Sequence, residues 1–200
     1  MPLESSEAKQ SQVDTATIQE TLLKVIRARS ETSLSRSSAL KNAVVEEVSN
    51  RDDFLYGHWM SLILVSGTGI RIILKVHFDT TTGRKMLANK MRRKPEDLDE
   101  RMAIDHVRES TNLFAGALKS SLSHAGIITG ISIPLVTSGF DEAVFSDKID
   151  SRKLHDVWKV RWDGGEVVCS CVSDILSWNE FSGLQLEDPV PEADADGEFL

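Results

Sequence analysis

The 200-residue sequence contains no apolar run of the ~18–20 residues that a membrane-spanning helix needs. Its first residues do not combine a basic stretch with an apolar one, so we expect no secretion signal. The only two cysteines, Cys169 and Cys171, are two positions apart in a predicted strand, a spacing that does not suit an unstrained disulfide. We therefore expect a cytoplasmic protein without membrane contact, whose cysteines are reduced strand residues.

Several kinds of catalytic motif are missing. The sequence has no Gly-rich phosphate loop, no nucleophile elbow and no dinucleotide fingerprint. The five histidines have no metal-ligand spacing with cysteines or carboxylates (His58, His77, His106, His124 and His155). We therefore expect neither a metal site nor a cofactor of the protein's own.

Positive charge is scarce, with 23 Lys and Arg against 31 Asp and Glu and a formal net charge of −8. One basic cluster occurs within residues 84–94, but no aromatic residue is interleaved with it. This pattern does not favour binding to nucleic acid, which needs clustered cations and stacking partners. A solvated helix and turn, or a surface for an acidic partner, are the remaining interpretations of the cluster.

Both ends of the chain are polar. Residues 187–200 hold six acids, no base and two prolines, and the net charge would be −2 without those six acids. Such composition is typical of disorder. We therefore expect a disordered N-terminus at 1–14, one domain at 15–178 and an acidic disordered tail at 179–200.

The first half of the domain shows one helix and one hairpin. Apolar residues at helical spacing predict a helix over 15–29, and a serine-rich loop is expected at 31–38. Residues 41–50 fit a strand or a short helix. Two β-rich runs, 58–66 and 69–78, are joined through Gly67 and Gly69 and predict a hairpin covered on at least one face.

The second half predicts two helices and more strands. We expect a helix over 80–91, capped by Asp79 or Thr80, with Met86, Leu87 and Met91 facing inward. A longer helix is expected over 95–125, followed by a strand within 127–139 and a hairpin around Asp163-Gly164-Gly165. This order indicates an α+β (mixed α/β) fold, with long helices packed on an antiparallel-rich sheet.

The long helix has two different faces. Its expected core stripe is apolar (Ile104, Val107, Thr111, Phe114, Ala115, Leu118 and Leu122). A second stripe consists of Asp105, Glu109, Asn112 and Gly116 and lies about 130° away around the helix. The stripe is either an ordinary solvent-exposed surface or a face that another molecule approaches closely. Asn and Gly are poor helix formers, and a close approach would explain why they occur here.

The stripe resembles the signature of the CheC/CheX/FliY family of chemotaxis phosphatases. The pattern is Asp/Ser-x3-Glu-x2-Asn followed by small apolar residues and Gly, and it reads DHVRESTNLFAG at 105–116. The flanking segments KMLANKMRRKPEDLDERMAIDHV, ISIPLVTSG and SLILVSGTGIRIILKVHFD extend the resemblance over about residues 57–173. One copy of the motif is visible, which is closest to the single-site CheX type.

The resemblance implies a phosphatase that acts on the phospho-aspartate of a CheY-type receiver protein. The receiver would contribute the acyl phosphate, a Mg²⁺ ion and a lysine. Asn112 would orient the attacking water and Glu109 would pair with the receiver's lysine. Asp105, Arg108 and Gly116 would contact the partner. A homodimer is also implied.

One position departs from the family pattern. The residue before the motif Glu is often Gly in the family, and here it is Arg108. A long cation at this point either obstructs a receiver or binds its acidic pocket. Together with the acidic C-terminal segment, it favours an alternative, in which the protein is a non-catalytic receiver-binding or scaffold module of a signalling complex.

Overall fold

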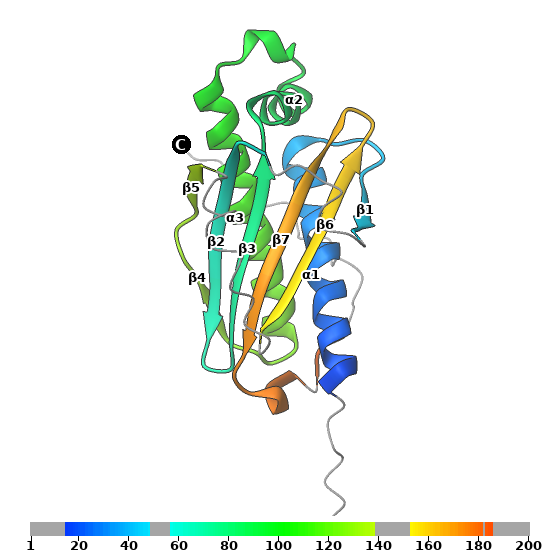
Figure 1. Cartoon of the computed structure of the whole chain (residues 1–200), viewed down its shortest axis with the longest axis vertical. Helices are drawn as coiled ribbons and strands as arrows, with labels where there is room; N and C mark the ends of the chain where they lie inside the picture. The colour runs from blue at the N-terminus through cyan, green and yellow to red at the C-terminus, as the bar shows by residue number, and fades with distance from the viewer. Residues whose placement is uncertain (1–14, 49–56, 139–152, 182, 186–200) are drawn as a thin grey trace, which may run out of the picture.

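The computed structural model describes residues 15–48, 57–138, 153–181 and 183–185, and these form one antiparallel sheet with two long helices on one face (Figure 1). The strand order is β1-β6-β7-β3-β2-β4, and β5 also pairs with β2. The expected α+β fold class is confirmed. The strands are β1 (Val44–Glu47), β2 (Trp59–Gly67), β3 (Ile70–Phe78), β4 (Thr129–Ile131), β5 (Leu135–Ser138), β6 (Leu154–Trp162) and β7 (Gly165–Ile175).

The helices are α1 (Thr15–Ser38), α2 (Thr80–Met91) and α3 (Glu100–His124), with short 3₁₀ turns at η2 (Pro95–Asp97) and η3 (Trp178–Phe181). Helices α1 and α3 run side by side behind the sheet, while α2 lies across one end of it (Figure 1). The core lies between the sheet and the two long helices and includes Leu22, Phe114 and Trp158. In the part of the chain that the structure describes, no helix is long and apolar enough to cross a membrane.

Both predicted hairpins form. Strands β2 and β3 pair with Ser66 opposite Arg71, and β6 and β7 pair with Trp162 opposite Gly165. At the first turn, a Cβ on Gly67 would lie 2.3 Å from the carbonyl oxygen of Ile128. Glycine is therefore required there because β4 passes directly beside β2.

The expected single strand within 127–139 is two short strands, β4 and β5, which both pair with β2. Pro134 has no N–H group and lies in the gap between them. Ser132 bridges this gap, because its N–H donates to the Leu64 carbonyl (2.9 Å) and its Oγ accepts from the Leu64 N–H (3.0 Å). The ladder is thus maintained although the strand is interrupted.

The prediction of a loop at 31–38 is wrong, since α1 continues to Ser38. Serine hydroxyls can bond to backbone groups in loops, but here Ser30 and Ser37 bond to carbonyls of their own helix, and Ser30, Ser37 and Ser38 also have partners on β6 or α3. Ser30, Ser33, Ser37 and Ser38 are all buried against the sheet or α3. The segment at 41–50, for which strand and helix were both open, contains strand β1.

Helix α2 has the predicted bounds. The Asp79 side chain accepts a hydrogen bond from the Thr82 N–H (2.6 Å), as an N-cap should. Met86 and Leu87 are buried as expected, but Met91 is 40% exposed. Met91 is the last residue of the helix, before Arg92 turns the chain in the left-handed conformation.

Helix α3 begins at Glu100 rather than at residue 95. Pro95 opens a separate 3₁₀ turn, and the chain is then extended at Leu98, whose side chain is buried. Asp99 restarts the helix, because its carboxylate accepts from the Met102 N–H (2.7 Å). The end at His124, followed by Gly126 with φ 81°, agrees with the predicted stop.

The expected domain boundary at residue 178 is too early. Phe181 is 1% exposed and Leu184 is 8% exposed, and both belong to the core cluster. The apolar residues Phe181 and Leu184 therefore belong to the core of the domain and not to a tail. The predictions for 1–14 and for the acidic residues from 187 onward lie outside the described residues.

Cys169 and Cys171 are free and fully buried in β7. Burial raises the pKa of the Cys171 thiol to about 12, and it also raises the pKa of Cys169. Both thiols therefore stay protonated at neutral pH, as expected for strand residues without a reactive role.

Candidate functional site

Helix α3 presents the motif stripe on its outer side. Asp105 and Glu109 are exposed, while Asn112 and Gly116 are half-buried. The opposite side carries most of the predicted core stripe, with Val107, Thr111, Phe114, Ala115, Leu118 and Leu122 buried and Ile104 only half-buried. Residues three and four apart are neighbours on a helix, so the four motif residues form one continuous strip.

The rotation of α3 is fixed by polar contacts with α1. Ser37 Oγ donates to Ser110 Oγ (2.9 Å), and Ser38 Oγ lies 2.9 Å from His106 Nε2. The Ser110 hydroxyl also donates to the His106 carbonyl (2.9 Å). Because these four side chains are buried, turning the helix would leave polar atoms without partners.

His106 adds no charge beneath the motif at neutral pH. Burial, together with the positive charge of Lys90, lowers its pKa to about 4. The imidazole is therefore neutral, and the charges of the strip come from exposed Asp105, Arg108 and Glu109.

Arg108 is held beside the motif by an ion pair. One of its guanidinium nitrogens lies 3.1 Å from the Asp105 carboxylate, and both side chains are about half exposed. A pair in solvent at this spacing contributes little to stability. It does, however, direct the guanidinium along the same side of the helix as the motif.

Gly116 has no structural requirement within its own fold. An added Cβ would meet no atom of the described residues within 4 Å, and its φ is not in the left-handed region. Glycine in a helix interior costs about 1 kcal/mol relative to alanine. This cost has no packing reason in the described part of the chain.

The first turn of α3 is anchored by a residue that sequence reasoning did not single out. The Glu100 carboxylate accepts from Thr80 Oγ1 (2.8 Å) and from Trp59 Nε1 (3.2 Å). These hydrogen bonds lower the pKa of Glu100. They tie α3 to the first residues of α2 and β2, so the motif helix is fixed at its N-terminal end too.

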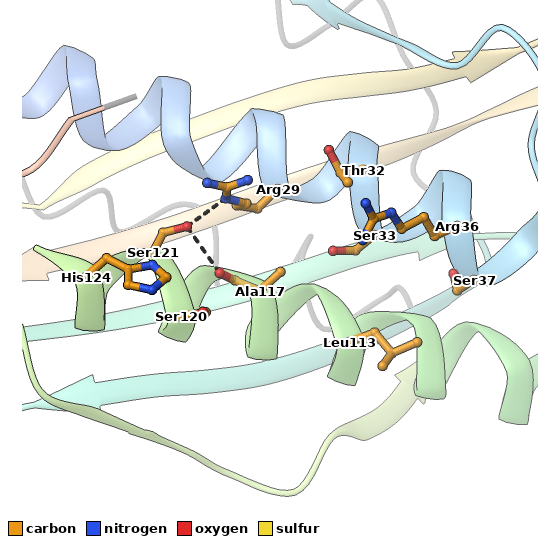
Figure 2. Close-up of a pocket in the computed structure, with 10 residues that line it drawn as sticks. All are labelled: Arg29, Thr32, Ser33, Arg36, Ser37, Leu113, Ala117, Ser120, Ser121 and His124. Atoms are coloured by element: carbon orange, nitrogen blue, oxygen red, sulfur yellow. Dashed lines mark hydrogen bonds between the residues drawn. The ribbon is translucent and has the colours of Figure 1, made fainter. Parts of the chain in front are cut away.

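A groove of about 280 Å³ lies between α1 and α3, next to the motif strip (Figure 2). Figure 2 shows the lining residues, which come from both helices: Arg29, Thr32, Ser33, Arg36 and Ser37 from α1, and Leu113, Ala117, Ser120, Ser121 and His124 from α3. Sequence reasoning missed this groove because four of the five α1 residues that line it lie in the segment that was interpreted as a loop. Two arginines, two serines and a threonine at helical spacing were the available signal.

Among the described residues, no three His, Cys, Asp or Glu side chains come together as a metal site. The strip itself contains two carboxylates and one carboxamide, with a guanidinium beside them. Such a surface can donate and accept hydrogen bonds and pair with cations. It is able to position groups that another molecule supplies.

Comparisons with known proteins agree with this description. Residues 60–152 match the family of the chemotaxis phosphatase CheX, and this range contains the whole motif strip. No curated protein matches the chain.

Solved structures of chemotaxis proteins share the fold. The CheC-like superfamily protein from Shewanella sp. PV-4 is 21% identical, with a TM-score of 0.58 over 77% of this chain and 97% of its own. CheX from Vibrio vulnificus is 19% identical, with a TM-score of 0.59 over 76% and 99%. The CheX-CheY-BeF3-Mg²⁺ complex from Borrelia burgdorferi contains a chain that is 12% identical, with a TM-score of 0.59 over 76% and 96%.

The resemblance that the sequence predicted is therefore confirmed: residues 60–152 carry the sequence pattern of the chemotaxis phosphatase CheX, and the described domain has the CheC/CheX fold.

Proposed function

We propose that this protein is a CheX-like phosphatase, which hydrolyses the phospho-aspartate of a CheY-type response-regulator receiver. The observation that carries the proposal is that Glu109 and Asn112 lie one turn apart on the outer face of α3. Buried hydrogen bonds to α1 hold this helix in its orientation. The match of residues 60–152 to CheX supports a chemotaxis phosphatase role at the family level. The reaction transfers the phosphoryl group to water and leaves the receiver's aspartate and inorganic phosphate.

In this proposal Asn112 orients the attacking water. A carboxamide can accept from and donate to water without adding negative charge beside the phosphoryl group. Glu109 pairs with the lysine of the receiver and so fixes the approach. Positioning and electrostatics supply most of the rate in phosphoryl transfer, so two well-placed side chains are sufficient for a contribution from the phosphatase.

The remaining residues of the strip contact the partner. Asp105, in the first turn of the motif, assists docking of the receiver. Its carboxylate also holds the Arg108 side chain beside the motif through their ion pair. Arg108 faces the acidic pocket of the receiver, where its guanidinium binds carboxylates. Gly116 lets the receiver's backbone approach the helix, since no side chain projects there.

The metal of the reaction belongs to the receiver in this proposal. The solved complex from Borrelia burgdorferi contains CheX, CheY, BeF3 and Mg²⁺ together, which supports a Mg²⁺-loaded receiver as the substrate. The strip's carboxylates, Asp105 and Glu109, are exposed and one turn apart. Glu109 is therefore available for pairing with a partner's cation, whereas Asp105 already pairs with Arg108.

The test is the decay of phosphate from a Mg²⁺-loaded, phosphorylated CheY-type receiver, with and without this protein. We expect acceleration that falls at least 100-fold in Asn112→Ala and is partly retained in Asn112→Gln. Asn89→Ala, on the exposed side of α2, is the matched control. Unchanged acceleration in Asn112→Ala would remove the basis of the proposal.

The second candidate function is a non-catalytic receiver-binding or scaffold module. Arg108 favours it, because its ion pair with Asp105 places a long side chain beside the site. Binding of the phosphorylated receiver without faster phosphate loss, across a panel of receivers, would select this alternative.

We also propose a homodimer. Four apolar side chains at the edge of the sheet support it, since Ile128, Ile131, Ile133 and Leu135 are 85%, 37%, 81% and 60% exposed. Sedimentation at micromolar concentration tests it. A dimer that dissociates in Ile133→Glu is expected, and a monomer at all concentrations would contradict the proposal.

A further inference from the structure

The groove between α1 and α3 is positively charged. Arg29 and Arg36 line it from α1, and no carboxylate is among its lining residues. Leu113 and Ala117 give it an apolar part. Within the described residues, the exposed Arg36 side chain has no ion pair or hydrogen bond. A surface of this kind fits an acidic chain segment with small side chains.

The groove has a defined direction. Arg29 Nε donates to Ser121 Oγ (2.6 Å) near one end, and Ser37 bonds to Ser110 near the other, so α1 and α3 are antiparallel. His124 lies at the first end (Figure 2). Leu113, at the second end, is the neighbour in sequence of Asn112. The groove therefore leads along α3 from its C-terminus to the motif strip.

The chain itself arrives at the His124 end. A Cβ on Gly183 would lie 3.4 Å from the carbonyl oxygen of Ala125, the residue after His124. Leu184 is then buried in the core. The six acids at 187–198 follow within a few residues, in a sequence that is otherwise rich in small side chains and proline.

The acidic segment has sufficient length. The groove extends along α3 from residue 124 to residue 113, which is about 16 Å at 1.5 Å per residue. Residues 186–198 span up to about 45 Å when extended. A few extended residues therefore bring the acids beside Arg29, and the rest can reach Arg36 and the motif.

We propose that the acidic segment 187–198 of this chain binds in the groove between α1 and α3, where its carboxylates pair with Arg29 and Arg36. Bound there, the segment lies next to Asn112 and competes with an incoming receiver. This consequence rests on the proposed phosphatase function, whereas the binding itself does not.

Disulfide trapping in the full chain tests the binding directly. Ala193→Cys is combined with Ser120→Cys in the groove or, as the matched control, with Arg71→Cys on β3. Both partner positions are exposed. Arg71 pairs with Asp174 near the point where the chain leaves β7, so an unbound segment would reach it readily. The buried Cys169 and Cys171 do not compete for oxidised glutathione.

We expect cross-linking to Cys at position 120 to be at least 10-fold faster than to position 71. Arg36→Glu, or replacement of the six acids by Asn and Gln, should reduce that ratio to near one. Near 1 M salt should reduce it as well, because the Debye length is then about 3 Å. Equal rates at both positions in the unaltered segment would overturn the proposal.

A second measurement addresses the competition. The chain with the six acids neutralised should dephosphorylate a receiver about five-fold faster than the unaltered chain at low salt, with the difference lost at high salt. Selective cross-linking with no such difference would overturn the competition. A failure of phosphatase activity in both chains would count against the proposed function, and the cross-linking result would be unaffected.

Discussion

Ser38 Oγ lies 2.9 Å from His106 Nε2, so the last turn of α1 is joined to the turn of α3 that carries Asp105 and Glu109. Both residues are buried. Their contact connects a segment outside the range matched to CheX with the motif inside it.

Ser38→Ala should destabilise the protein by about 1–3 kcal/mol, because it leaves the imidazole nitrogen of His106 buried without its partner. Urea unfolding monitored by tryptophan fluorescence measures this. Ser120→Ala, an exposed serine of α3, should change the free energy of unfolding by less than about 0.5 kcal/mol. Equal effects of the two substitutions would show that the contact does not stabilise the fold.

Acid should destabilise the fold between pH 6.5 and 5. Burial, aided by Lys75, lowers the pKa of His77 to about 3, and burial with Lys90 lowers that of His106 to about 4. The unfolded chain binds protons near pH 6.5 and the folded one does not, so stability is complete above that pH and is lost as the pH falls.

The expected loss is up to about 2 kcal/mol for each histidine over this range. Unfolding curves at pH 7, 6 and 5 measure it, and His106→Gln should remove about half of the dependence. A free energy of unfolding that stays constant from pH 7 to 5 would contradict the assignment of neutral, buried imidazoles.

Gly116→Ala should stabilise the isolated protein by about 0.5–1 kcal/mol, because the helix gains a better former and the added Cβ meets no described atom. Gly116→Leu should also fold, with the leucine in solvent. If the strip receives a partner, Gly116→Leu should weaken receiver binding at least 10-fold. Unchanged binding, measured by titration with a phosphorylated receiver, would show that no close approach occurs at this position.

Arg108→Ala should change the free energy of unfolding by less than about 0.5 kcal/mol, because the ion pair of Arg108 with Asp105 is half exposed. Receiver affinity should fall about five-fold if the guanidinium binds the acidic pocket. Tighter binding in Arg108→Ala would instead identify the side chain as an obstruction. Lys41→Ala, at an exposed position outside the basic cluster 84–94, serves as the control for the loss of one positive charge.

Ser30→Ala should cost about 1–3 kcal/mol. Trp158 Nε1 donates to Ser30 Oγ (2.8 Å) beneath α1, and the indole N–H would be left buried and unpaired. Thr21→Ala removes a hydroxyl that bonds only to the Thr17 carbonyl of its own helix, so it should be nearly neutral. The free energies of unfolding of the two variants, measured by urea denaturation, check this prediction.

The sequence allowed α2 to be predicted residue for residue, because Asp79 is a strong cap and the pattern after it is short and regular. It also allowed both hairpins to be predicted, since glycines mark their turns. The second half of α1 could not be predicted. The serine-rich sequence around Ser33 and Ser37 is typical of a loop. Both serines are buried in the fold, where Ser37 bonds to Ser110 of α3, and the local sequence does not indicate this contact.

The motif strip was predictable from spacing, and its exposure followed from the apolar stripe on the other side of α3. Its supports were not predictable. Glu100, His106 and Ser38 act through partners 20 to 68 positions away in the sequence. Periodicity along one helix contains no information about such distant contacts. The roles of Glu109 and Asn112 remain predictions.

Helix α1 packs into the core of the folded domain, although it lies outside the residues that match CheX in sequence. Residues 60–152 match CheX, but β6 and β7 lie beyond this range and α1 and β1 lie before it. A fragment trimmed to the matched range would expose the sheet edge of β3 and the side of α3 that α1 covers. We therefore expect a fragment trimmed to residues 60–152 to be less stable than one that also contains α1, β1, β6 and β7.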